Sequence, residues 1–110
     1  MVAKAGKREA PAKVPPVTVD GIRYEVLHYG KREGLEQNGG YVVAKDAETG
    51  KELRKIKIYD VTYDPNGKEM DSQDIFITKM SKAWLGPRLN IKDEHGRSWT
   101  LHLDTGTVTP

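Results

Sequence analysis

Hydrophobic and polar residues alternate with a period of two along most of this chain. Between residues 22 and 29, Ile22, Tyr24 and Val26 would share one face of a strand, with polar residues on the other. No segment keeps the apolar period of about 3.6 residues that a helix requires, so we expect no long helix. The alternating runs predict six strands, at residues 22–29, 41–45, 52–63, 74–79, 89–93 and 97–103, and the short runs 17–19 and 107–109 are candidates for a further one.

A turn signature recurs three times between these runs, at residues 45–51, 64–68 and 92–97. Each copy has an acidic residue, a few polar residues, a glycine and then a cation. Glycine reaches the positive φ that tight hairpins need, and Asp or Asn accepts hydrogen bonds from its own turn backbone. The signature therefore predicts an antiparallel all-β fold.

The longest run, residues 52–63, changes phase partway along. Ile56 and Ile58 have one parity, whereas Tyr59 and Val61 have the other. A one-residue slip moves every side chain to the opposite face, so we expect a β-bulge or bend at this point. The alternative is a strand buried on both faces. We expect one all-β domain over residues 17–109, with six or seven antiparallel strands in a curled sheet or small barrel, in preference to a sandwich.

Charge is distributed unevenly along the chain. The 18 basic and 16 acidic residues give a formal net charge of +2, but residues 1–13 alone carry +3 and the remainder −1. Residues 1–16 are rich in Ala, Lys and Pro, which predicts a disordered basic arm. A near-neutral domain is not typical of nucleic-acid binding. The alternative is a weak nucleic-acid binder that uses the cations of the arm, which are Lys4, Lys7, Arg8 and Lys13.

The composition also limits the expected cellular location of the protein and the kinds of chemistry that its side chains can perform. The chain has no cysteine, which excludes disulfides, thiolate catalysis and cysteine-bound zinc. No apolar stretch approaches the roughly 20 residues that span a bilayer, and no apolar segment follows the basic amino terminus. We expect a cytoplasmic protein with no membrane partner.

One hairpin resembles a known repeat. Residues 40–53 read Gly-Tyr-Val-Val-Ala-Lys-Asp-Ala-Glu-Thr-Gly-Lys-Glu-Leu, which is similar to the repeat of pyrroloquinoline-quinone-type β-propellers, with Arg54 where that family has tryptophan. A propeller needs several four-stranded blades, which a chain of 110 residues cannot build. The resemblance implies the hairpin geometry and none of the quinone chemistry.

A wider set of segments, residues 34–41, 59–64 and 74–78, resembles a group of small uncharacterised bacterial proteins. This resemblance implies a bacterial origin and no particular activity.

The spacing of the candidate catalytic and metal-binding residues does not match that of known kinds of site. His28, His95 and His102 do not fall at the spacing of a convergent ligand set, so we expect no metal and no cofactor. Ser98 and His102 lie four residues apart on one strand face, about 13 Å, which is too far for a nucleophile and its base. We therefore expect no enzymatic activity.

An acidic stretch between residues 60 and 74 leaves one alternative open. Its five carboxylates could gather a hard cation such as calcium, although Asp64-Pro65-Asn66-Gly67 fits a turn better than a calcium loop. These carboxylates belong to Asp60, Asp64, Glu69, Asp71 and Asp74.

The function that we favour is a non-catalytic module that binds a protein or peptide, as a monomer or homodimer. An exposed edge strand could supply the surface, or the long loop at residues 30–40 together with residues 84–88. Trp84 and Arg88 are residue types favoured at interaction hot spots, although Trp84 could instead cap the core. The candidate partner-binding residues are Trp84, Arg88, Lys31, Arg32, Gln37 and Asn38.

Overall fold

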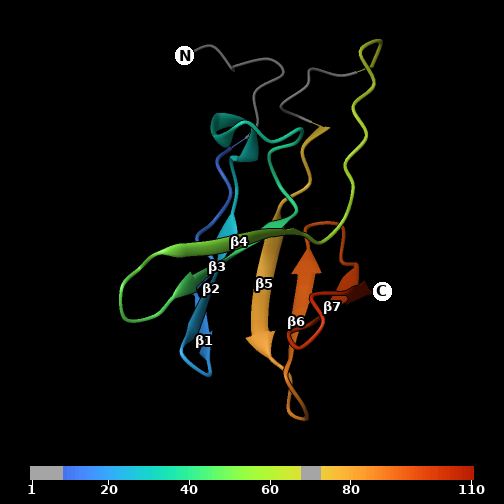
Figure 1. Cartoon of the computed structure of the whole chain (residues 1–110). Helices are drawn as coiled ribbons and strands as arrows, with labels where there is room; N and C mark the ends of the chain where they lie inside the picture. Colours follow the sequence, from blue (N-terminus) through green and yellow to red (C-terminus); the bar gives the residue numbers. More distant parts are fainter. Residues whose placement is uncertain (1–8, 68–72) are drawn as a thin grey trace.

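Two four-stranded antiparallel sheets form this all-β fold (Figure 1). The computed structural model describes residues 9–67 and 73–110. Sheet A has the order β1-β2-β3-β4 and sheet B the order β5-β6-β7-β8, so each is a simple meander. The strands are β1 (Val17–Val19), β2 (Ile22–Leu27), β3 (Tyr41–Asp46), β4 (Glu52–Lys57), β5 (Ile77–Lys82), β6 (Arg88–Asp93), β7 (Ser98–His102) and β8 (Val108–Thr109).

Two of the three predicted turn signatures close hairpins. Between β3 and β4, Asp46 Oδ1 accepts the backbone N–H groups of Glu48 and Thr49 at 2.9 Å each, and Gly50 has a φ of 77°. The β6–β7 turn repeats this chemistry with Asp93 and Gly96. The side-chain acceptor and the positive-φ glycine therefore act as the sequence predicted.

The third signature forms a turn but not a hairpin. Asp64 Oδ1 accepts the N–H of Asn66 at 2.9 Å, and its carbonyl accepts the N–H of Gly67 at 3.1 Å. The described residues on either side, 58–67 and 73–76, contain no strand. The prediction of strands flanking this turn is wrong there.

The expected small barrel with six or seven strands is also wrong. Eight strands divide between two sheets, and the described residues form no closed barrel. The phase change after Ile58 marks the point where the chain leaves sheet A. β4 ends at Lys57, and the backbone of the next residues bonds to a side chain: Gln37 Nε2 donates to Tyr59 O at 2.8 Å, and Val61 N–H donates to Gln37 Oε1 at 2.9 Å. Because Gln37 replaces a neighbouring strand, Tyr59 and Val61 stay buried without extending the sheet.

The strand predicted at residues 74–79 begins later, at Ile77, and continues to Lys82. Asp74 lies before it, buried and hydrogen-bonded to the side chains of Tyr63 and Asn38. Side-chain bonds to these two residues hold Asp74 outside the β5–β6 ladder.

The core lies between the two sheets. Val42 of β3, with Leu89 and Leu101 of sheet B, is fully buried. Tyr59 stacks on Trp99 of β7, with ring centroids 5.4 Å apart, and so links the segment after sheet A to sheet B. The sheets approach each other along β1 and β5 (Figure 1).

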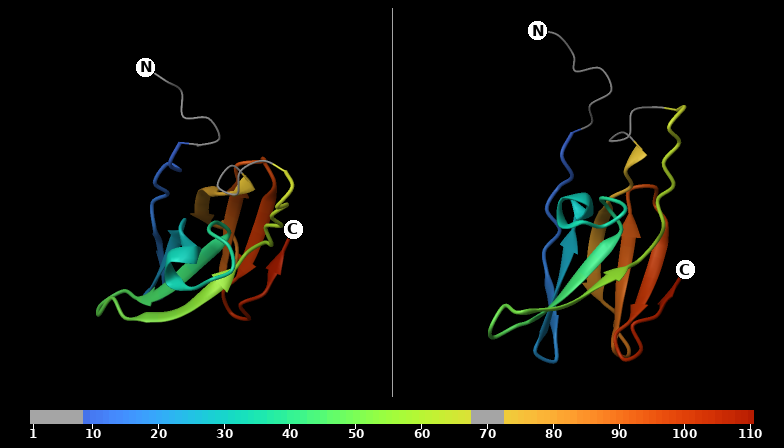
Figure 2. Two further views of the ribbon diagram at one scale, coloured as in Figure 1. Left: turned by 90° about the horizontal axis from the view of Figure 1, so that it is seen from above. Right: turned by 45° about the horizontal axis from the view of Figure 1, so that its top comes forward.

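Outside the sheets, residues 9–16 of the predicted arm have no secondary structure and pass η1 (Gly30–Glu33), a 3-10 turn, before entering β1 (Figure 2). Val14 packs against the core. No helix in the described ranges is long and apolar enough to cross a membrane.

Candidate functional site

The candidate binding residues lie at two ends of the molecule. Lys31 and Arg32 are on η1, next to the start of β5, whereas Trp84 follows the end of β5. The two ends of β5 lie at opposite ends of the sheet (Figure 1). The span from Phe76 to Trp84 along β5 is roughly 25 Å at the usual rise of a strand. The loop at residues 30–40 and the segment 84–88 therefore form two separate surfaces rather than the joint surface proposed from the sequence.

The loop at residues 30–40 is shaped by close backbone contacts. A Cβ on Gly30 would lie 2.4 Å from Gln37 O, and a Cβ on Gly39 would lie 2.3 Å from Ile75 O. Gln37 itself is only 2% exposed, and its amide bonds to Gly39 O, Tyr59 O and Val61 N–H. Gln37 thus organises the interior of the loop, while the cations of η1 remain exposed.

Asn38 belongs to a polar network beneath this loop. The hydroxyl of Tyr63 donates to Asp74 Oδ1, and Asn38 Nδ2 donates to Asp74 Oδ2 at 3.1 Å. Burial, reinforced by the hydrogen bond to Asp74, raises the pKa of Tyr63 to about 12. Tyr63 therefore stays a hydrogen-bond donor at neutral pH. Lys31 Nζ lies 4.1 Å from the centroid of the Tyr63 ring, above one edge of the network.

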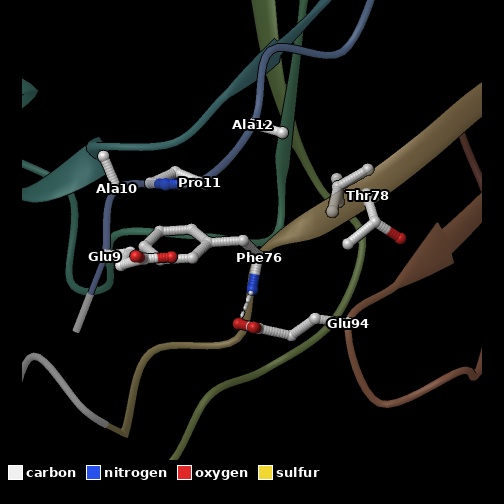
Figure 3. A pocket seen from close by; sticks show the side chains of 8 residues that line it. Glu9, Ala10, Pro11, Ala12, Phe76, Thr78 and Glu94 are labelled. Carbon is white, nitrogen blue, oxygen red and sulfur yellow. Dashed lines mark hydrogen bonds between the residues drawn. The ribbon is translucent and has the colours of Figure 1, made fainter.

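Two hollows of about 420 Å³ each flank Phe76, and together they form what we name the Phe76 groove. Figure 3 shows the hollow that Thr78 and Glu94 line. Both are lined by Phe76 and by Glu9, Ala10 and Pro11; one continues to Thr78 and Glu94. The other hollow reaches Tyr29, Lys31, Arg32, Asn38 and Asp74. Three of the residues proposed from the sequence, Lys31, Arg32 and Asn38, therefore meet in one hollow.

Phe76 is fixed at the floor of this groove. Its N–H donates to Glu94 Oε1 at 2.8 Å, and the N–H of Glu94 donates to the Phe76 carbonyl at 2.9 Å (Figure 3). His28 and Tyr29 pack edge-to-face with the Phe76 ring, at centroid distances of 5.4 and 6.1 Å. No sequence pattern pointed to this aromatic group, because Phe76 lies almost 50 residues from the other two and resembles an ordinary core residue.

The β5–β6 turn presents an apolar tip. Trp84 is 91% exposed and Leu85 62% exposed, so the hypothesis that Trp84 caps the core is wrong. Arg88 braces the turn: its Nε and Nη2 donate to Leu85 O at 3.1 and 2.8 Å, and its carbonyl accepts the N–H of Ala83 at 2.8 Å. We name Trp84 and Leu85, in this braced turn, the Trp84–Leu85 tip.

The outer face of sheet B carries a group of cations and hydroxyls that sequence reasoning missed. Lys79 of β5 and Lys92 of β6 are cross-strand partners, both exposed, and neither makes an ion pair within the described part of the chain. They line a shallow hollow of about 260 Å³ with Ser81, Asn90, Ser98 and Thr100. These residues come from three strands, and only the pairing register brings them together.

The other proposed groups are dispersed. Of the arm cations, Lys13 is exposed, and Lys4, Lys7 and Arg8 lie outside the described residues. In the acidic stretch, Asp60 Oδ1 pairs with Lys57 at 3.0 Å. Glu69 and Asp71 fall outside the described ranges, within which no three His, Cys, Asp or Glu side chains gather as a metal site would require.

Comparison with known protein families, curated proteins and solved structures finds no match to this chain. The resemblances to propeller repeats and to small bacterial proteins therefore stay predictions, and function is inferred from the residues themselves.

Proposed function

We propose that this protein is a non-catalytic binding module that recognises a partner protein through the Trp84–Leu85 tip. The observation that carries the proposal is the 91% exposure of Trp84 beside an exposed leucine. Scattered apolar side chains are normal on protein surfaces. An exposed tryptophan next to an exposed leucine is instead typical of interaction hot spots.

The brace supplied by Arg88 supports this proposal. A tip that is already ordered loses less conformational entropy when it binds, so more of its contact energy appears as affinity. Lys82, next to the turn, is exposed. A partner with an apolar socket and an acidic rim would complement the tip.

The test is capture of partners by the full chain and by three variants, followed by measurement of affinity for each partner found. Trp84→Ala and Leu85→Ala should each weaken binding at least tenfold, which is the loss of about 1.4 kcal/mol expected at a hot spot. The matched control is Leu53→Ala, because Leu53 is also exposed, at 48%, but lies on β4. Undiminished binding of every partner by both tip variants would refute the proposal.

Arg88 provides a second, independent readout. If Arg88 acts by bracing the turn, Arg88→Lys should weaken binding nearly as much as Arg88→Ala, since lysine lacks the forked geometry that bonds Leu85 O twice. If Arg88 instead contacts the partner through its charge, lysine should rescue most of the affinity.

A second candidate function, binding of single-stranded nucleic acid, is favoured by the pairing of Lys79 with Lys92. Like charges opposite each other on a sheet are destabilising, and an anion lying between them would relieve the repulsion. Phosphate contacts of this kind make affinity fall as salt rises.

The experiment compares two full-length variants with wild type in binding a mixed-sequence oligonucleotide at several salt concentrations. Lys79→Gln with Lys92→Gln tests the sheet face, and neutralising Lys4, Lys7, Arg8 and Lys13 tests the arm. A variant that removes phosphate contacts should reduce the slope of log affinity against log salt concentration. The reduction should be roughly 0.7 for every phosphate that the protein no longer neutralises. Wild-type binding that does not change with salt would exclude both routes.

A further inference from the structure

Residues 9–12 of the chain already lie in the Phe76 groove. Glu9, Ala10 and Pro11 line both hollows, and Figure 3 shows them gathered around the Phe76 ring. Pro11 is partly buried, whereas Ala10 and Ala12 on either side are exposed. The groove therefore shows directly which kind of segment it can hold: an extended one, with a proline between two small residues.

The groove has the chemistry of a proline-recognition surface. Phe76 and Tyr29 line a hollow together with Pro11, and His28 and Tyr29 each pack edge-to-face with Phe76. His28 Nε2 lies 3.0 Å from the carbonyl oxygen of Ala12, so a ring N–H can donate to the backbone of the segment. Aromatic walls with a few donors to backbone carbonyls are the general means of binding Pro-containing extended peptides.

The segment is held loosely compared with the strands. Residues 9–16 pair with no strand, whereas β1, which follows directly, pairs with β2. Segments without strand pairing open at a lower free-energy cost than the paired strands of a core. The two hollows extend on both sides of the segment, so it leaves part of the groove unfilled.

The charged residues that line the groove indicate the orientation in which a peptide would bind. Lys31 and Arg32 line the hollow that Glu9 also lines, and Arg32 lies 4.4 Å from the centroid of the Tyr29 ring. The Asp74 carboxylate in the same hollow accepts hydrogen bonds from Tyr63 and Asn38. Apart from Glu9 of the segment itself, the exposed charges that line this hollow are the two cations, and they favour an acidic residue on the amino-terminal side of the proline.

We propose that the Phe76 groove binds an extended peptide of a partner protein, with proline between small residues and an acidic residue two positions before it. Residues 9–12 occupy the groove in cis and must leave when the partner binds. This site is distinct from the Trp84–Leu85 tip and does not depend on it.

The test uses the full chain and a synthetic peptide, Glu-Ala-Pro-Ala-Lys-Val, which repeats residues 9–14. Amide NMR signals of His28, Tyr29 and Phe76 report on the groove, and the Trp84 indole reports on the tip. The chain is prepared as wild type, as Pro11→Gly to weaken the internal competitor, and as the matched control Pro15→Gly, since Pro15 is exposed outside the groove.

We expect the peptide to shift the groove signals saturably in every form, with an apparent Kd at least tenfold lower for Pro11→Gly than for wild type. The reason is that an intramolecular competitor lowers apparent affinity by the fraction of time it occupies the site. Pro15→Gly should behave as wild type. Replacing the peptide proline by glycine should weaken binding at least tenfold, and so should the protein variant Arg32→Gln. The variant Trp84→Ala should leave the Kd of the peptide unchanged.

Three results would overturn the proposal. The first is the absence of a saturable shift in folded Pro11→Gly. The second is equal binding of the glycine peptide. The third is a concentration-dependent dimer with contacts between Pro11 of one copy and Phe76 of another, which would make a second copy the occupant. Failure of the tip hypothesis would leave all these outcomes unchanged, so the two proposals are tested separately.

Discussion

At the scale of single residues, Asp93 is held by an unusually full set of hydrogen bonds. Its side chain is fully buried, and its two oxygens accept four hydrogen bonds, from the N–H groups of His95 and Arg97, from Arg97 Nε and from Trp99 Nε1. Burial alone would raise the pKa of this carboxyl, but the donors of Trp99, Arg97 and His95 outweigh it and lower the pKa. Asp93 therefore fixes both the hairpin turn and the orientation of Trp99.

Replacing Asp93 by alanine should lower the free energy of unfolding by about 2–4 kcal/mol, because it leaves several donors without their charged acceptor. Urea denaturation followed by circular dichroism measures this. Asp104→Ala, at an exposed aspartate in another turn, is the control and should change stability by less than about 0.5 kcal/mol. Equal effects of the two substitutions would contradict the role given to Asp93.

His28 makes the chain sensitive to mild acid. Burial lowers its pKa from the ordinary value of 6.5, and this outweighs the opposing effects of the Ala12 carbonyl and the Glu94 charge. Its Nδ1 is buried and has no hydrogen-bond partner in the described residues, so a second ring proton would have no acceptor. The folded chain thus favours neutral His28. As pH falls below about 6.5, the unfolded chain takes up a proton more readily than the folded chain, and stability decreases.

The free energy of unfolding of wild type should therefore decline more between pH 7 and pH 5.5 than that of His28→Phe, which keeps an aromatic ring beside Phe76 but cannot titrate. Denaturant melts at matched salt measure the difference. Parallel pH profiles for the two proteins would rule out this role for His28.

At the scale of elements, the loop at residues 30–40 is a packed connection. The sequence shows its glycines, and their number favours a loop, but it does not distinguish a turn glycine from one needed for close approach. Gly34 has a φ of 84° with open space around it, whereas Gly39 lies against the carbonyl of Ile75. The partner atoms belong to a segment almost 40 residues away, so only the folded chain reveals the contact.

Gly39→Ala should consequently destabilise the protein by more than about 3 kcal/mol or prevent folding, since a backbone carbonyl must move to admit the methyl group. Gly34→Ala should cost about 1–2 kcal/mol, the penalty of placing a Cβ in the left-handed region. Thermal melts of the two variants test this comparison. Equal stability of the Gly39→Ala and Gly34→Ala variants would show that the backbone around Gly39 shifts to admit the methyl group.

At the scale of the whole molecule, the two sheets depend on each other for burial. Leu101 of β7 and Val42 of β3 are each fully buried in one common core, and Tyr59 stacks on Trp99 between the sheets. The apolar face of a single four-stranded meander must be buried against another layer. We therefore expect the sheets to unfold together.

In a Trp84→Phe background, fluorescence of Trp99 and far-ultraviolet circular dichroism should give coincident unfolding transitions. Leu101→Ala should shift both by the same amount, with a loss of about 2–5 kcal/mol typical of a cavity in a packed core. A Trp99 transition that separates from the circular dichroism transition would show that the sheets unfold independently.

Features that depend on neighbours along the chain could be predicted from the amino-acid sequence alone. Period-two alternation predicted most of the strands, and an acidic residue followed by glycine predicted two of the three hairpin turns, because both depend on local backbone conformation. Features that depend on distant contacts required the folded chain. Gln37 draws the chain out of sheet A after Lys57, and the two-sheet arrangement then separates Trp84 from the loop at residues 30–40. The same arrangement brings Pro11 and Phe76 together in one groove, with His28 packed on Phe76, because segments far apart in the sequence become neighbours only when the sheets pack.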